Sequence, residues 1–203
     1  MNRIITIGRE FGSGGREIGR RLAERLNFAY YDQEIVIEIA KRTDLAEEYI
    51  KNIEERQPLP LLPITIGRTF TLAPNTIADQ SQAVYTEQSK VIQEMAQKSD
   101  CVIVGRCADY VLRETSPFRL FVYADMNSKM ERCRKKGYEE NLLNDQELQR
   151  KILSVDRARA KYYQFYTDQV WGDKKNYDLC MNTSAIDIKK AVDAIAKFLP
   201  FEL

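Results

Sequence analysis

A glycine-rich loop near the amino terminus has the residue types and spacing that suit anion chemistry. Gly12, Gly14 and Gly15 lie between a β-branched apolar run, Arg3–Gly8, and a helical pattern, Ile18–Leu26. Glycine allows positive φ and a close approach of the backbone to a ligand, so successive N–H groups can converge on an anion. The following helix points its free N–H groups at the same place. The pattern predicts a phosphate site, and a plain chain-reversing turn is the alternative.

The loop departs from the standard Walker A pattern at two positions. Gly15 stands where that pattern has a Lys, and Glu17 stands where a hydroxyl residue would contact Mg²⁺. Arg16 and Arg9 are the cations nearby, since no Lys precedes Lys41. Arg16 can supply the missing charge with a different reach and geometry. Glu17 suits the helix dipole, but it repels a phosphate unless it faces away or meets a metal.

Charged residues also follow two of the apolar runs that read as strands. Asp32 comes directly after residues 28–31, and Arg106 follows residues 101–104 with one Gly between. Ligands of parallel sheets bind at the carboxyl ends of the strands, so these side chains should converge on the glycine loop. A buried Arg needs an anionic partner, which is either a bound phosphate or a carboxylate such as Asp32.

A long predicted helix, Asp145–Tyr166, carries a third set of candidates. Asp156 and Arg159 share one of its faces, although a solvated charged helix is the plain alternative. Aromatic residues gather near its end, namely Tyr162, Tyr163, Phe165, Tyr166 and Trp171. The rings could stack a base, but the packing of a lid or of a dimer contact is a more common role for such a cluster.

Apolar runs alternate with helical patterns along the chain, which predicts an α/β fold with a parallel sheet and helices on both faces. The expected strands are residues 3–8, 28–31, 101–104, 119–124 and 177–181. The expected helices are residues 18–26, 33–41, 44–55, 78–97, 108–112, 128–136 with Asn127 as its cap, 145–166 and 186–199. Four prolines exclude a continuous helix or a central strand from residues 57–75. That segment is either a flap over a site or a partner chain, or an ordinary surface loop.

Length and composition limit the choice of function. With 203 residues, of which 44% are hydrophobic, we expect one domain spanning residues 1–203. A net charge of +1 gives no sign of nucleic-acid or membrane binding, and no apolar stretch is long enough for a membrane helix or patterned as a signal peptide. Four cysteines without Cys-x-x-Cys spacing and no His argue against a transition-metal site and favour a cytoplasmic location. Phosphoryl transfer needs no His, because it depends on positioning and charge.

Four segments give the chain a resemblance to the cytidylate kinase-like family, a branch of the P-loop nucleoside monophosphate kinases. They are residues 8–19, 31–32, 102–110 and 156–178. The resemblance implies a P-loop NTPase fold of the nucleoside monophosphate kinase type, with five parallel strands in the order 2-3-1-4-5. It also implies phosphoryl transfer from ATP, with Mg²⁺, to CMP or a related nucleoside monophosphate. Residues 57–75 would then be an acceptor-side flap, and residues 145–176 an arginine-rich lid.

Individual site residues follow from the same resemblance. The phosphates of the donor would be bound by Gly12, Ser13, Gly14, Gly15, Arg16 and Glu17. The acceptor would be bound by Asp32, Arg106, Asp156 and Arg159. The residues expected to act in catalysis are Arg16, Arg132, Arg157 and Asp32. No protein metal ligand is expected.

The chain also departs from true cytidylate kinases after Gly105-Arg106, where Cys107 replaces an Asp. Together with the missing loop Lys, this leaves other functions open. One is a kinase for a different small acceptor, and another is a nucleotide- or anion-binding module without catalysis. A third is a homodimer with a mainly structural role, built on the flap and the aromatic cluster.

Overall fold

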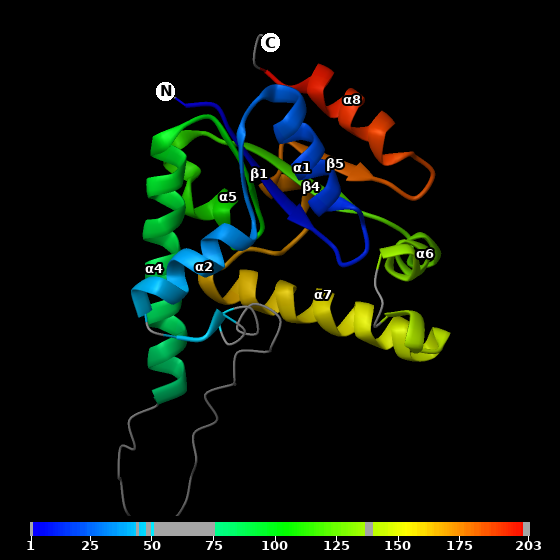
Figure 1. The fold of residues 1–203 in the computed structure, drawn as a ribbon, viewed down its shortest axis with the longest axis horizontal. Helices are drawn as coiled ribbons and strands as arrows, with labels where there is room; N and C mark the ends of the chain where they lie inside the picture. The colour runs from blue at the N-terminus through cyan, green and yellow to red at the C-terminus, as the bar shows by residue number, and fades with distance from the viewer. Residues whose placement is uncertain (1, 44, 48–49, 51–75, 137–139, 201–203) are drawn as a thin grey trace, which may run out of the picture.

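Five strands form one parallel sheet in a computed structural model that describes residues 2–43, 45–47, 50, 76–136 and 140–200 (Figure 1). The strands are β1 (Ile4–Arg9), β2 (Ala29–Tyr31), β3 (Cys101–Val104), β4 (Phe118–Tyr123) and β5 (Leu179–Asn182). Their order is β2-β3-β1-β4-β5, and every neighbouring pair is parallel. The fold class and strand order expected from the sequence are confirmed.

Helices cover both faces of the sheet, and two more lie beside the carboxyl ends of its strands (Figure 1). One face is covered by α1 (Gly15–Leu26) and α8 (Ile188–Phe198), and the other by α2 (Gln33–Thr43), α4 (Thr76–Lys98) and α5 (Ala108–Val111). The helices at the carboxyl edge are α6 (Met126–Lys136) and α7 (Asp145–Thr167). Three short 3₁₀ turns span Arg113–Thr115, Glu140–Leu142 and Lys174–Asn176.

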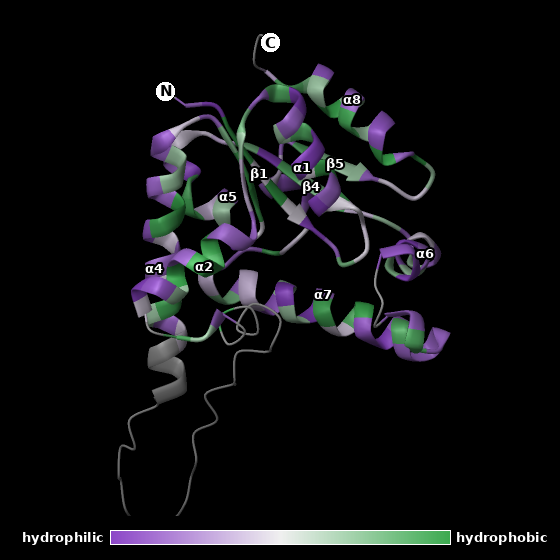
Figure 2. Cartoon of the chain, viewed as in Figure 1, coloured by the Kyte–Doolittle hydropathy of each residue, from purple (hydrophilic) through white to green (hydrophobic). Residues whose placement is uncertain are grey.

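The alternation of side chains along β1 divides the core into two layers. Ile5 and Ile7 pack with α1 and α8, whereas Ile4 packs with α2 and α4. Successive residues of a strand point to opposite faces, so a strand of β-branched apolar residues fills both layers. Figure 2 shows the apolar sides of the helices turned toward this sheet. Burial on both faces fixes the position of β1, and with it the start of the glycine loop.

Some predicted boundaries differ from the structure or lie outside the described residues. Helix α6 begins at Met126, and its cap is Asp125, whose Oδ1 accepts the N–H of Ser128 at 2.7 Å. The Asn127 cap expected from the sequence is wrong, because a cap side chain bonds the N–H two or three residues onward. Most of the expected 44–55 helix and the whole 57–75 flap lie outside the described residues. Within the described residues, no helix meets the length and apolarity needed to cross a membrane.

Candidate functional site

The glycine loop keeps an open conformation between β1 and α1. Gly12 and Gly14 have φ values of 74° and 87°, which non-glycine residues rarely adopt. A Cβ at Gly12 would also stand 2.9 Å from the carbonyl oxygen of Lys129. The backbone N–H groups of residues 14–17 meet no hydrogen-bond acceptor within the described residues. The loop therefore presents several unused donors at the positive end of a helix, as an anion site requires.

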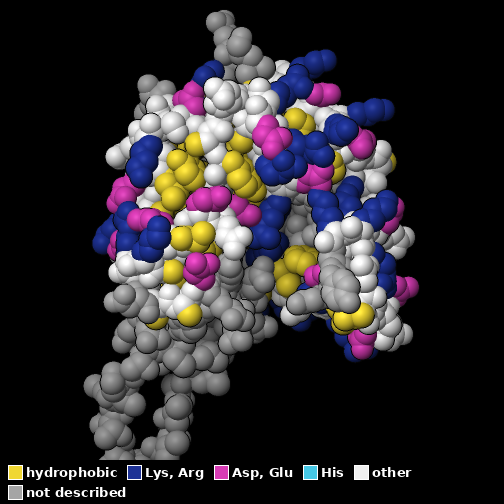
Figure 3. All heavy atoms as spheres, in the orientation of Figure 1, with side chains coloured by type: hydrophobic (Ala, Val, Ile, Leu, Met, Phe, Trp, Pro, Cys, Tyr) yellow, Lys and Arg dark blue, Asp and Glu magenta, His cyan; other side chains and the backbone are white. Residues whose placement is uncertain are grey.

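These donors face a cavity of about 300 Å³, large enough for several phosphate groups. Its lining combines the loop with α6 and α7, namely Arg9, Glu10, Phe11, Gly12, Gly14, Gly15, Arg16, Glu17, Arg132, Cys133, Lys136, Glu140 and Arg159. Lys and Arg side chains border the hollow between α1, α6 and α7 on the face shown in Figure 3. The expected donor-site residues thus lie in one positively charged cavity, except Ser13, which is buried beneath it.

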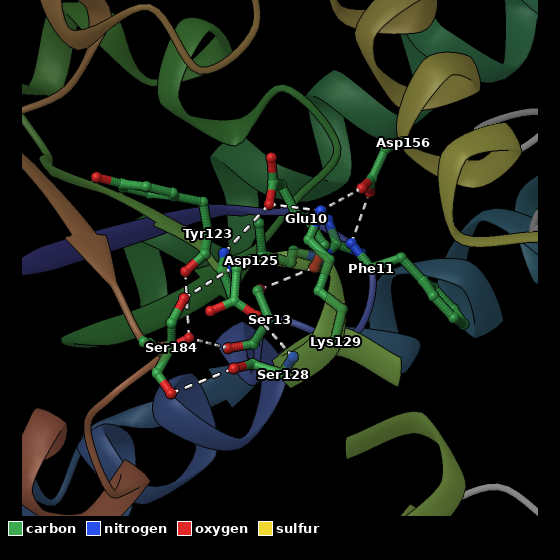
Figure 4. A network of polar contacts seen from close by, with 12 residues as sticks. Glu10, Phe11, Ser13, Tyr123, Asp125, Ser128, Lys129, Asp156 and Ser184 are labelled. Carbon is green, nitrogen blue, oxygen red and sulfur yellow. Dashed lines mark hydrogen bonds and ion pairs between the residues drawn. The ribbon is translucent and has the colours of Figure 1, made fainter. Parts of the chain in front are cut away.

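A buried charge cluster holds the loop from behind (Figure 4). The ammonium of Lys129 lies 2.6 Å from Glu10 Oε2 and 2.9 Å from Asp156 Oδ2. Asp156 Oδ1 also accepts the N–H of Phe11 at 2.6 Å. Burial disfavours the charged form of Lys129, but the two carboxylates outweigh this effect and raise its pKa. We call Lys129, Glu10 and Asp156 the rear cluster.

Two hydroxyl groups fix the loop further. Ser13 Oγ donates to the carbonyl oxygen of Glu10 at 2.8 Å (Figure 4). Thr183 Oγ1 donates to the carbonyl oxygen of Ser13 at 2.7 Å. Neither bond uses the N–H groups of residues 14–17. The loop is thus held in place while its ligand-facing donors remain available.

Arg16 and Asp32 form an ion pair at the edge of the cavity. Arg16 Nε lies 2.8 Å from Asp32 Oδ2, where the Arg16 side chain is 64% exposed and that of Asp32 is 13% exposed. Two residues expected to act in catalysis are therefore neighbours. In this arrangement the guanidinium of Arg16 is turned toward Asp32.

Arg132 reaches the cavity from α6. One terminal nitrogen donates to the carbonyl oxygen of Thr183. The other, Nη1, is buried and has no hydrogen-bond partner among the described residues. A buried donor of this kind is costly unless it meets an acceptor, so Arg132 suits a phosphate oxygen. Arg157 differs: its side chain is exposed and lies outside the cavity linings described in this chain.

Glu17, which also lines the cavity, is bound by two cations. Its carboxylate pairs with Arg21 at 2.9 Å and with Lys136. Burial opposes ionisation, but hydrogen bonds from Lys136 and Arg21 outweigh it, so the pKa of Glu17 is lowered. Two cations of the protein thus partly neutralise a negative charge that faces the cavity.

Three buried arginines converge deeper in the site, where β1 and β3 end beside α7. Arg9 and Arg106 are each 5% exposed, and Arg159 is 6% exposed. They line a small inner cavity of about 20 Å³. Arg106 Nη1 donates to Gln88 Oε1 at 3.2 Å, and Arg159 Nη1 approaches the carbonyl oxygen of Arg9 at 3.5 Å. The expected acceptor residues Arg106 and Arg159 therefore lie together, whereas Asp156 belongs to the rear cluster.

A buried carboxyl group closes the inner cavity on the far side. Asp109 Oδ2 accepts a 2.6 Å hydrogen bond from Tyr163 Oη. Burial raises the pKa of Asp109, against the opposing effect of that hydrogen bond. Asp109 thus favours its neutral form more than an exposed Asp does.

The aromatic cluster packs within the protein except for Phe165, which is 61% exposed. Tyr166 stacks on Tyr85 of α4 with ring centroids 3.9 Å apart, and Trp171 meets Phe121 of β4 edge-on at 5.2 Å. These contacts join α7 to α4 and to the sheet. A base that stacked on Tyr166 would need another face of the ring or a shift of Tyr85.

Sequence reasoning gave no site role to three residues that the structure brings to the site. Arg9 was named only as a cation near the loop; it ends the buried strand β1, so the argument applied to Arg106 would have assigned it to the site. Lys129 lies four residues before Cys133 on the inner side of α6, a spacing that marks a buried face. Asp109 carries no sequence signal, since its burial depends on α7 packing over it.

The site fits Mg²⁺ only with ligands from the nucleotide. No group of three or more His, Cys, Asp or Glu within the described residues could hold a metal ion. Mg²⁺ commonly binds one or two carboxylates together with substrate phosphates and water. Glu17 and Glu140 line the cavity without belonging to the rear cluster. Glu17, in the first turn of the helix that follows the loop, is the residue suited to this part.

A protein-family model matches nearly the whole chain, including the residues of this site. The match is to the cytidylate kinase-like family and covers residues 4–185. The chain belongs to the cytidylate kinase-like family. No curated protein matches the sequence. Membership in this family, together with the kinase fold, supports phosphoryl transfer to a small acceptor.

Solved structures share the fold over almost the full length. An uncharacterised protein from Eubacterium ventriosum has 26% identity and a TM-score of 0.72, covering 99% of this chain and 100% of that one. Shikimate kinase from Bacteroides thetaiotaomicron has 15% identity and a TM-score of 0.58, covering 98% and 99%. Shikimate kinase from Acinetobacter baumannii, solved with shikimate, has 14% identity and a TM-score of 0.54, covering 98% and 92%. The two shikimate kinases show a shared fold at this level of identity.

Proposed function

We propose that this member of the cytidylate kinase-like family transfers the terminal phosphoryl group of ATP to a small acceptor, with CMP or a related nucleoside monophosphate as the preferred one. The observation that carries the proposal is the set of unused N–H groups at residues 14–17, which open into a cavity lined by Arg132 and Arg16. Backbone amides and guanidinium groups are the usual donors to phosphates in proteins.

The residues divide between donor and acceptor. The loop amides and the buried Nη1 of Arg132 bind donor phosphate oxygens, while Arg106 and Arg159 attract the anionic group of the acceptor. Asp32, which is paired with Arg16, can accept the proton of an acceptor hydroxyl once Arg16 moves to a phosphate. Positioning and charge then supply most of the rate enhancement, as in other phosphoryl transfers.

Mg²⁺ bound to the nucleotide would neutralise charge on the transferred group. Glu17 is the protein carboxylate suited to contact it, and Arg21 and Lys136 hold that carboxylate in its ionised form.

A transfer assay tests the proposal. The purified chain, with Mg²⁺ and ATP labelled at its terminal phosphate, is offered CMP, dCMP, UMP, AMP, GMP and, because of the fold, shikimate. We expect the label on CMP or another pyrimidine monophosphate. Asp32→Asn should lower kcat about 100-fold with nearly unchanged ATP affinity, while Glu24→Gln on the exposed side of α1 serves as the matched control.

Two observations favour a second candidate function. The Arg16–Asp32 ion pair and the absent loop Lys would also suit a nucleotide-binding module without catalysis. ATP binding by calorimetry with no label transfer to any acceptor would support the module. Failure to bind ATP at all would exclude both candidates.

A further inference from the structure

The space beside Gly15 is filled by the side chain of Arg9. A Cβ at position 15 would stand 2.5 Å from Arg9 Cβ, 3.2 Å from Arg9 Cγ and 3.4 Å from Val122 Cβ. Real Cβ atoms essentially never approach other heavy atoms closer than 3.0 Å. Gly15 is the position where the Walker A pattern has its Lys. In this chain the space for that side chain is therefore occupied from β1.

A second glycine makes room for the other end of Arg9. A Cβ at Gly105, just after β3, would overlap the guanidinium of Arg9, with Nη2 at 3.1 Å. Gly105 also has a φ of 76°, which disfavours a side chain there. The Arg9 side chain thus runs from the start of α1 to the end of β3 between two glycines. Its 5% exposure reflects this enclosed path.

The path of Arg9 leads to the junction of the two cavities. Arg9 lines both the 300 Å³ cavity in front of the loop and the 20 Å³ cavity of the buried arginines. Arg159 is the other residue common to both linings. In the proposed reaction, the transferred group passes from the donor side to the acceptor side, so a cation at this junction can contact it in both positions.

We infer that Arg9 takes the place of the missing phosphate-loop Lys and binds the terminal phosphoryl group of the donor. The inference rests on the proposed function and names a residue that the sequence pattern did not select for this part. A guanidinium stays charged and offers two parallel donors to phosphate oxygens. Arg16, the sequence-based candidate, instead pairs with Asp32 and is mostly exposed.

The geometric half of the inference is tested without a ligand. Gly15→Ala should lower Tm in the wild-type background, because the new Cβ meets Arg9. The same substitution should leave Tm unchanged or raise it in an Arg9→Gly background, where the Cβ and Cγ that it would meet are both absent and Ala favours the helix. Equal losses of Tm in both backgrounds would show that Arg9 does not occupy this space and would overturn the inference.

The functional half is tested by calorimetric binding of ATP and ADP with Mg²⁺. Arg9→Ala should weaken ATP binding about tenfold or more and reduce the preference for ATP over ADP. The double variant Arg9→Gly with Gly15→Lys removes the Cβ that a side chain at position 15 would meet, restores a cation from the Walker position and should recover most of the loss. Arg20→Ala, an exposed α1 variant whose Arg pairs with Glu24, should bind as the wild type does.

The outcomes separate this inference from the proposed function. ATP binding that survives in Arg9→Ala but is lost in Arg16→Ala would overturn the role of Arg9 and leave the kinase proposal intact. A wild-type chain that binds no ATP would overturn both. Circular dichroism identifies any variant that fails to fold. If Arg9→Ala does not fold, Arg9→Lys, which keeps the charge, replaces it. Arg9→Lys should lose part of the ATP affinity.

Discussion

The glycine loop has two sides that differ in whether their charged and hydrogen-bonding groups have partners in the protein. Behind it, Lys129 is buried between two carboxylates, and Asp156 bonds the loop backbone directly. In front of it, the N–H groups of residues 14–17 and Nη1 of Arg132 have no partner within the described residues. The rear is complete without a ligand, whereas the front gains hydrogen bonds only when an anion binds.

This contrast explains how the loop can be held in one conformation and still bind an anion. Glycines at positions 12 and 14 cannot hold a loop by their own side chains, so the rear cluster and Thr183 do so. Buried ion pairs are costly to break because one partner remains as an uncompensated charge. The open N–H donors in front can be hydrogen-bonded by water, so leaving them without a protein partner costs little free energy until an anion replaces the water. Variants on the two sides should therefore act on different quantities.

The largest effect is expected from Lys129→Met. This change leaves Glu10 and Asp156 facing each other and should lower the free energy of unfolding by about 3–5 kcal/mol. Urea denaturation followed by the fluorescence of Trp171, the single Trp, measures it. Lys135→Met on the exposed side of α6, where Lys135 pairs with Glu131, should cost under about 1 kcal/mol. Similar losses of unfolding free energy in both variants would show that the rear cluster stabilises the chain no more than a surface ion pair does.

On the front side, Arg132→Ala should change binding more than stability. Loss of its buried donor should weaken ATP affinity about tenfold, as measured by calorimetry. Arg134→Ala is the matched control, because Arg134 lies on the same helix but pairs with Asp145 and the carbonyl oxygen of Leu143. Unchanged ATP affinity in Arg132→Ala would mean that Nη1 of Arg132 does not bind the nucleotide.

Glu17→Gln tests the charged residue at the front by its pH dependence. Because the pKa of Glu17 is lowered on folding, its ionised form stabilises the chain above the ordinary pKa of 4.5, and this contribution is lost as the pH falls through the lowered value. The wild type should exceed Glu17→Gln by about 0.5 kcal/mol at neutral pH. Unfolding at pH 7 and at pH 3 measures the difference, which should shrink in acid. A constant difference would contradict the linkage.

The smallest effect is expected from Arg16→Ala. The Arg16–Asp32 pair has one mostly exposed partner, and such pairs contribute under about 0.5 kcal/mol. Thermal unfolding of Arg16→Ala beside Arg20→Ala, the exposed neighbour on α1, checks this. A loss comparable to that of Lys129→Met would show that the front of the loop is also held by buried charge.

Local patterns predicted most of the fold. The β-branched runs at residues 4–7 and 101–104 became adjacent parallel strands, because apolar alternation and burial act over a few residues. The cap of α6 was missed by two positions, since Asp125 and Asn127 are both good caps and only the path of the chain after β4 selects Asp125.

The site was predicted less completely than the fold. The glycine loop and Arg106 were recognised because each directly follows a strand. The rear cluster was missed because Glu10, Lys129 and Asp156 come from separate parts of the chain and meet only after α6 and α7 pack beside the loop. The sequence analysis assigned the missing positive charge to Arg16 because Arg16 is next to Gly15. It could not show that the Arg9 side chain fills the space beside Gly15.

The amino-acid sequence is sufficient to predict a β-α unit with a glycine loop, since glycine torsions and apolar periodicity are local properties. It also shows that the loop lacks its usual Lys. Which cation lies near the loop depends on packing, because side chains from β1, α1 and the end of β3 together fill the space there. Residues distant in sequence compete for one space, and their packing determines which of them a phosphate can reach.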